Sequence, residues 1–178
     1  MPDNPRSPGA RAAGGVRAGI ERFIDVVGAA TAWVALAIVG LMATNVLLRY
    51  LFSEGSVWAQ ELEWHLLVPL VLFGMSYALL HGDHVRVDIV YGKFSDRAKV
   101  IVDLVSALLT AAISVLVIWL SIQYVQQAYV IDEGSPDPGG IPHRYLVKSL
   151  IPIGFALLFL QSVAIALGSI EKLRKSRP

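Results

Sequence analysis

Four long runs without a charged residue constrain this chain more than any other feature. They are Val26 to Leu48, Leu66 to Leu80, Leu104 to Ile131 and Ser149 to Ile170. A helix that crosses the roughly 30 Å hydrocarbon core of a bilayer needs about 20 apolar residues, and little else selects for such runs. The sequence therefore predicts an all-α integral membrane protein with four transmembrane helices.

The composition agrees, because only 16% of the 178 residues are charged against roughly 25% in soluble domains. No segment outside the runs is long enough to bury a core of its own. We predict a disordered basic tail over residues 1–19, a four-helix transmembrane domain over 20–172 and a cytoplasmic basic tail over 173–178. The predicted spans are about 24–48, 57–80, 99–131 and 145–170. Any ligand chemistry must then lie between helices or on a partner.

The remaining composition excludes several classes of protein. The chain has no cysteine, which excludes disulfides and thiolate metal sites. Its positive residues are dispersed around the membrane boundaries, a pattern that does not indicate a nucleic-acid partner. The first apolar run is too long for a signal peptide and lacks a small-residue cleavage site, so we interpret it as a retained span.

Positive charges predict the orientation of the spans. Twelve of the 15 Lys and Arg residues lie in the N-terminal segment, the connection between the second and third spans, and the C-terminus. Arg49, Arg144 and Lys148 are the other three. The positive-inside rule therefore predicts that both termini lie in the cytoplasm.

Three local patterns refine the predicted spans. The small residues Gly28, Ala32 and Gly40 are candidates for close helix contact, although such spacing also arises by chance. The third run would reach about 42 Å as a helix, which predicts a strong tilt or a projection beyond the bilayer. Residues 85–94 have apolar positions at helical spacing, which favours a short interfacial helix between the second and third spans. The alternation of apolar and polar residues there also fits a strand, but an open strand edge near lipid is unfavourable.

Trp58, Glu61, His65 and Pro69 share one face of the second predicted helix. A proton relay or ion site at Glu61 and His65 is one interpretation. The favoured alternative is an interfacial anchor whose Glu–His contact orients the helix. Arg49 is also positioned to pair with Glu61 or Glu63 across the short turn between the first two spans.

Cofactor and catalytic motifs are weak or absent in the sequence. His81, Asp83 and His84 resemble a metal cluster, but solvated loop histidines are far commoner than such a site. A haem site needs histidines at matching depth on facing helices, and only His65 and His143 would meet, near the outer surface. With no nucleophile beside a base and no phosphate loop, we predict no enzyme, no metal and no cofactor.

Four short motifs follow one another in the first half of the chain: residues 45–50 (NVLLRY), 58–63 (WAQELE), 74–78 (GMSYA) and 81–88 (HGDHVRVD). Their order and spacing resemble a known family, the small membrane subunit of tripartite ATP-independent periplasmic (TRAP) transporters. The similarity covers roughly residues 20–172 and implies a location in a bacterial inner membrane. Gln60 departs from the family pattern, since relatives often have an acidic residue there.

This resemblance implies a non-catalytic small subunit of a sodium-coupled transporter for organic acids, such as α-keto acids or similar carboxylates. Its implied partners are a large multi-span transport subunit, a periplasmic substrate-binding protein and membrane lipids. A haem- or quinone-associated anchor of a redox complex is the alternative. The residues that we predict for subunit contacts are Arg49, Trp58, Glu61, Glu63, His65 and His84.

Overall fold

The computed structural model describes residues 8–53, 55–82 and 94–175. These contain the four helices α1 (Pro8–Phe52), α2 (Val57–His81), α4 (Asp96–Val130) and α5 (Tyr145–Lys175). Each helix is long and apolar enough to cross a membrane. The prediction of an all-α protein with four membrane-spanning helices is therefore confirmed. His84 and nearly all of the predicted interfacial helix lie outside the described residues.

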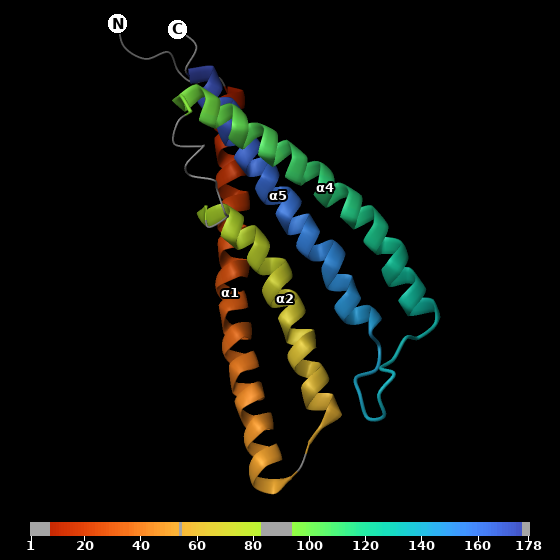
Figure 1. Ribbon diagram of the computed structural model, residues 1–178. Helices are drawn as coiled ribbons and strands as arrows, with labels where there is room; N and C mark the ends of the chain where they lie inside the picture. The colour runs from red at the N-terminus through yellow and green to blue at the C-terminus, as the bar shows by residue number, and fades with distance from the viewer. Residues whose placement is uncertain (1–7, 54, 83–93, 176–178) are drawn as a thin grey trace, which may run out of the picture.

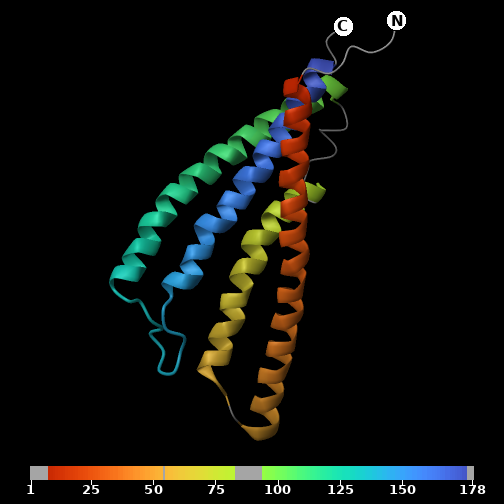
Figure 2. The same ribbon diagram turned by 180° about the vertical axis from the view of Figure 1, so that it is seen from behind.

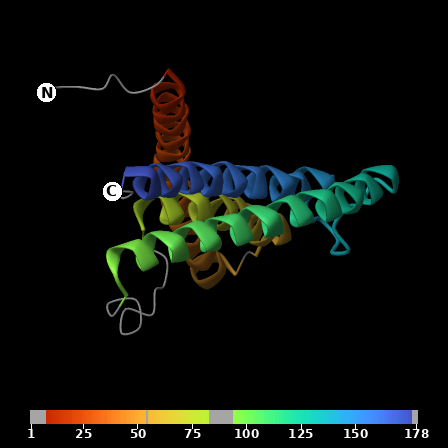
Figure 3. The same cartoon turned by 90° about the horizontal axis from the view of Figure 1, so that it is seen from above.

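The helices form an open fan, as Figure 1 shows, in the spatial order α1, α2, α5, α4. Helix α5 packs against the three others, whereas α4 packs mainly on α5. Figure 2 shows the same order from behind. Viewed from above, α4 and the N-terminal part of α1 lie on opposite sides of α5 (Figure 3). Helix α5 therefore joins α4 to the α1–α2 pair.

Local capping explains where the helices begin and end. The Ser56 side chain accepts a hydrogen bond from the Ala59 N–H at 3.3 Å, and Ser95 caps α4 in the same way through Ala98. Such side chains satisfy amide groups that have no partner within the first helical turn. Helix α2 ends at Gly82, whose φ of 77° lies in the left-handed region that glycine adopts without a steric penalty.

Helix α1 begins at Pro8, inside the segment 1–19 for which the composition predicts a disordered tail. Proline suits the first helical position, where its missing N–H is not needed. Arg17 and Glu21 then form an ion pair one turn apart, with a distance of 2.8 Å between Arg17 Nε and Glu21 Oε1. The Arg17 guanidinium also lies so close to Gly168 of α5 that a Cβ there would be 2.6 Å from Arg17 Nη1. These contacts favour helix in a segment whose composition alone indicates disorder.

Small residues line the seam between α4 and α5. The buried positions of α4 are Ala107, Ser114, Ser121 and Ala128, which recur every seven residues. A seven-residue repeat keeps one narrow stripe of a helix against its neighbour, and small side chains let the two backbones approach. The buried serine hydroxyls donate to carbonyls of their own helix, at 2.7 Å for Ser114 and 3.0 Å for Ser121. The seam therefore buries little volume and leaves no serine hydroxyl without a partner.

Glycines allow two further close contacts. A Cβ at Gly28 of α1 would lie 2.7 Å from Tyr77 Cβ and still closer to the tyrosine ring. A Cβ at Gly154 of α5 would lie 2.6 Å from Leu72 Cβ. The predicted role of Gly28 in helix contact is therefore confirmed, whereas Ala32 and Gly40 are exposed.

Most large apolar side chains lie on the outside of the fan. The exposed fraction is 73% for Trp33 of α1 and 60% for both Leu109 and Trp119 of α4. Such surfaces suit contact with lipid or with another membrane protein. The length of α1 and α4 points the same way: 45 and 35 residues reach about 68 and 52 Å, well beyond one hydrocarbon core.

Candidate functional site

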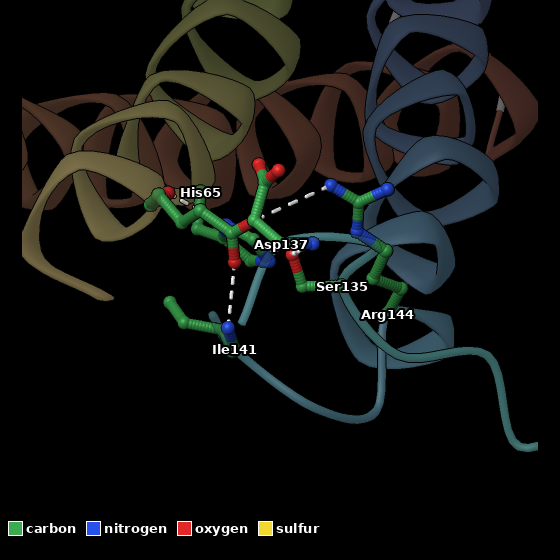
Figure 4. A network of polar contacts seen from close by, with 6 residues as sticks. His65, Ser135, Asp137, Ile141 and Arg144 are labelled. Carbon is green, nitrogen blue, oxygen red and sulfur yellow. Dashed lines mark hydrogen bonds and ion pairs between the residues drawn. The ribbon is translucent and has the colours of Figure 1, made fainter. Parts of the chain in front are cut away.

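The main polar network lies where the α4–α5 loop meets the first turns of α2 (Figure 4). The Glu61 carboxylate accepts a hydrogen bond from the Ser135 hydroxyl through Oε1 and another from the Ile141 N–H, 2.6 Å from Oε2. Arg144 Nη2 lies 3.7 Å from Oε1. The Glu61 side chain is only 12% exposed. One carboxylate therefore fixes a loop that is 74–80 residues away in sequence.

The loop passes too close to Glu61 to admit a side chain at Gly140. A Cβ there would lie 2.7 Å from Glu61 Oε2 and would also overlap Ser135. Because Gly140 has no side chain, the next residue, Ile141, can place its N–H within hydrogen-bond distance of the Glu61 carboxylate. The glycines and prolines of this loop are typical of turns, and Gly140 has the additional role of admitting Glu61.

The neck of the loop is closed by contacts between its two ends. His143 Nδ1 lies 3.0 Å from Asp132 Oδ1, and the Arg144 N–H donates to the Glu133 carbonyl at 2.8 Å. Lys148 donates to the Glu133 carboxylate, and its Nζ lies 4.0 Å from the centre of the Tyr124 ring. Asp132 and His143 adopt φ values of 45° and 59°. The neck therefore holds two non-glycine residues in the left-handed region, where isolated residues are rare.

Glu61 and His65 are adjacent on α2, as predicted, but their contact is not the expected one. His65 Nδ1 lies 2.7 Å from the Glu61 backbone carbonyl, not from its carboxylate. Because a carbonyl only accepts, Nδ1 carries the proton in this contact. Nε2 is buried and has no hydrogen-bond partner among the described residues. The carboxylate is occupied by donors from the loop, an arrangement that suits positioning better than proton relay.

The predicted pairing of Arg49 with Glu61 or Glu63 is wrong. Glu63 instead accepts a hydrogen bond from Asn45 Nδ2 at 3.1 Å, which joins α1 to α2. Glu61 is taken by the loop. Arg49 is exposed and forms no ion pair with any described residue. Its guanidinium is therefore free to meet a group outside the described part of this chain.

The other predicted residues are spread over both ends of the molecule. Trp58 is 49% exposed on the first turn of α2. His81, at the opposite end of that helix, lies 3.5 Å from Asp25 of α1. No group of three metal-binding side chains occurs among the described residues, but Asp83 and His84 lie outside them. The predicted absence of a metal therefore stays a prediction.

Two cavities flank the N-terminal end of α2. The larger, about 530 Å³, lies between α1 and α2 and is lined by residues including Leu41, Thr44, Asn45 and Ala59. The smaller, about 220 Å³, lies between α2, the loop and the start of α5. Ser135, Gly140 and Arg144 help to form this region, yet sequence reasoning assigned them no functional role. The sequence signal for them was the run of turn-forming residues at 134–140, followed four residues later by the basic Arg144.

Glu61→Gln is expected to loosen the loop without unfolding the helices. The neutral amide of glutamine can still accept from the Ile141 N–H and donate to the Ser135 hydroxyl, but both hydrogen bonds lose the charge of the carboxylate and Arg144 loses its ion pair. Hydrogen–deuterium exchange should become faster across residues 133–142. Glu63→Gln is the matched control, because its carbonyl oxygen still accepts from Asn45. Equal protection of the loop in both variants would contradict this role of Glu61.

Comparison with known proteins places these features in a family. The chain is 27% identical over 126 residues to the ectoine TRAP transporter small permease protein TeaB of Halomonas elongata, across 68% of this chain and 64% of that protein. It is 25% identical over 146 residues to the C4-dicarboxylate TRAP transporter small permease protein DctQ of Vibrio cholerae, across 71% and 63%. The chain thus matches just under two thirds of the length of each relative. A family model for the DctQ component of tripartite ATP-independent periplasmic transporters matches residues 38–172, and the chain belongs to this family of transporter subunits.

Proposed function

We propose that this chain is the non-catalytic small subunit of a sodium-coupled secondary transporter for organic acids. Its role is to hold a large multi-span transport subunit in the inner membrane. Membership of the small-permease family carries this proposal. The relative named for C4-dicarboxylate supports an organic acid as substrate, while the relative named for ectoine indicates that substrates differ among such systems.

The open fan supports a scaffold role. Helix α4 packs on α5 through a narrow stripe, and it exposes many large apolar side chains elsewhere on its surface. Helix α1 likewise exposes Trp33, Leu36 and Val39. A membrane protein that exposes so much apolar surface on both sides of one central helix suits a broad contact with a larger partner.

The proposed orientation has both termini in the cytoplasm and the Glu61 network on the periplasmic side. Helix α1 begins and α5 ends at the same end of the fan (Figure 1). That end carries Arg17, Arg22, Lys172 and Arg174, as the positive-inside rule requires of a cytoplasmic face. The rigid α4–α5 loop then faces the periplasm, where it is suited to help dock a substrate-binding protein.

Co-purification and uptake test the proposal together. A tagged chain in mild detergent should isolate a colourless complex with a large polytopic membrane protein. Deleting the small subunit should abolish uptake of an organic acid that depends on a sodium gradient. A Soret band in the complex, with redox partners, would favour the haem-anchor alternative instead. Uptake that persists without a sodium gradient would refute the coupling.

Arg49→Ala is expected to weaken association with the large subunit while leaving membrane insertion unchanged. The guanidinium is exposed and has no partner among the described residues, so its loss removes a charge that is available to the large subunit. The fraction of partner retained in the pull-down measures the effect. Arg22→Ala, an exposed arginine at the other end of α1, is the control. Full retention by Arg49→Ala would remove Arg49 from the interface.

A further inference from the structure

The smaller cavity has an unusual combination of charged groups. It is lined by Gln60, Glu61, Trp64, His65, Asp137 and Arg144, among others, and it lies near the N-terminal ends of α2 and α5. Three of these side chains carry a formal charge, two negative and one positive. Only the Glu61 carboxylate is fully engaged, because Ser135, Ile141 and Arg144 all contact it.

The two remaining charges are available to a ligand. The Asp137 side chain has no partner among the described residues; its backbone N–H donates to Ser135 Oγ at 3.1 Å, and its backbone carbonyl accepts from the Gly140 N–H at 3.0 Å. The Arg144 guanidinium is 34% exposed, and its single charged contact is the 3.7 Å approach to Glu61. A guanidinium carries five N–H donors, so most of them have no acceptor in the described part of the chain. The cavity therefore offers one free anion and one free set of cationic donors.

An apolar stripe continues from the cavity along α2. Trp64, Leu67 and Val71 are 73%, 49% and 54% exposed, and their spacing of three and seven residues places them on one face of the helix. The stripe runs along the helix axis toward the middle of the membrane-spanning segment. A molecule seated in the cavity thus meets a polar, charged end and an apolar track beneath it.

We propose that this cavity binds the headgroup of a zwitterionic phospholipid with a primary ammonium group, such as phosphatidylethanolamine. Its ammonium lies beside Asp137, its phosphate accepts from Arg144, and an acyl chain follows Trp64, Leu67 and Val71. The N–H groups of a guanidinium form strong, charge-assisted hydrogen bonds with phosphate oxygens. A basic side chain from a partner would satisfy Asp137 but would face Arg144 with a like charge, so a zwitterion is the better match.

Native mass spectrometry of the full chain tests the site. The protein is incubated in mild detergent with phosphatidylethanolamine, phosphatidylcholine and phosphatidylglycerol of identical acyl chains at equal concentration. Phosphatidylethanolamine should be retained preferentially. Asp137→Asn should lower its retention by about twofold to fivefold, the range expected for one exposed ion pair. Asp96→Asn, at the other end of the molecule, should leave retention unchanged.

Equal retention of the ethanolamine and choline lipids, or unchanged retention by Asp137→Asn, would overturn the proposal. A photocrosslinking residue in place of Gln60 shows whether a phospholipid or a segment of a partner protein fills the cavity in the assembled complex. Crosslinks to phospholipid support the site, whereas crosslinks to protein alone show that a partner segment fills the cavity and that the proposal is wrong. Neither measurement depends on transport, so either can fail while the proposed function stands.

Discussion

Gly28→Ala is expected to lower the free energy of unfolding by about 1–3 kcal/mol, the usual cost of an extra methyl group in a packed contact. The new Cβ would lie 2.7 Å from Tyr77 Cβ, so rotation of the tyrosine ring alone does not relieve the overlap. Either α1 and α2 separate or the backbone shifts. Unfolding titrations in mixed micelles measure the loss.

Gly40→Ala provides the matched control for this prediction. It lies on the same helix, and a Cβ there would meet nothing within 4 Å. Alanine favours helix over glycine by about 1 kcal/mol in soluble hosts, so this variant is expected to be as stable as the wild type or more so. The difference between the two variants isolates the clash with Tyr77. If Gly28→Ala is as stable as Gly40→Ala, the close approach of α1 and α2 is wrong.

Val115→Asp is expected to impair membrane insertion at a cost of about 2.5–3.5 kcal/mol on translocon scales. Val115 lies near the middle of α4 and is 52% exposed, on the part of the helix that no other described helix covers. An aspartate there would face lipid with no cation nearby on its own helix. The fraction of chain resistant to alkaline extraction from membranes measures the effect.

Gln127→Asp tests whether depth causes the defect in Val115→Asp. Gln127 is exposed on the same helix but lies close to its C-terminal end, where a carboxylate reaches water. Insertion of this variant is therefore expected to match the wild type. Normal insertion of Val115→Asp would show that α4 is not a membrane span at that position.

The helices were predictable because the length of an uncharged apolar run can be read directly from a continuous stretch of sequence. The second span, predicted at 57–80, is observed at Val57–His81, since Ser56 and Gly82 cap it. Residues 8–19 were not predictable from composition, because their order depends partly on a long-range contact of Arg17 with α5 near Gly168. The seven-residue repeat of Ala and Ser in α4 is present in the sequence, but the continuous apolar run around it makes the repeat hard to recognise.

The candidate site was harder to predict than the fold. The face shared by Glu61 and His65 followed from helical spacing, but the partners of Glu61 did not. Ser135 and Ile141 lie more than 70 residues away in sequence, and nothing in their local pattern indicates which carboxylate they meet. Arg49 appeared the natural partner because it is near in sequence. In the structure the α4–α5 loop supplies the hydrogen-bond donors to Glu61, and Arg49 remains exposed.

The repeat of Ala107, Ser114, Ser121 and Ala128 also limits how α4 can change during evolution. A single inserted residue would rotate everything after it by about 100° relative to the seam. If the insertion fell just after Ala107, the large side chains of Ile113 and Leu120 would replace those of Ser114 and Ser121 against α5. Substitutions across the outward face carry no such penalty. Helix α4 should therefore diverge freely in composition while its length between Ala107 and Ala128 stays fixed.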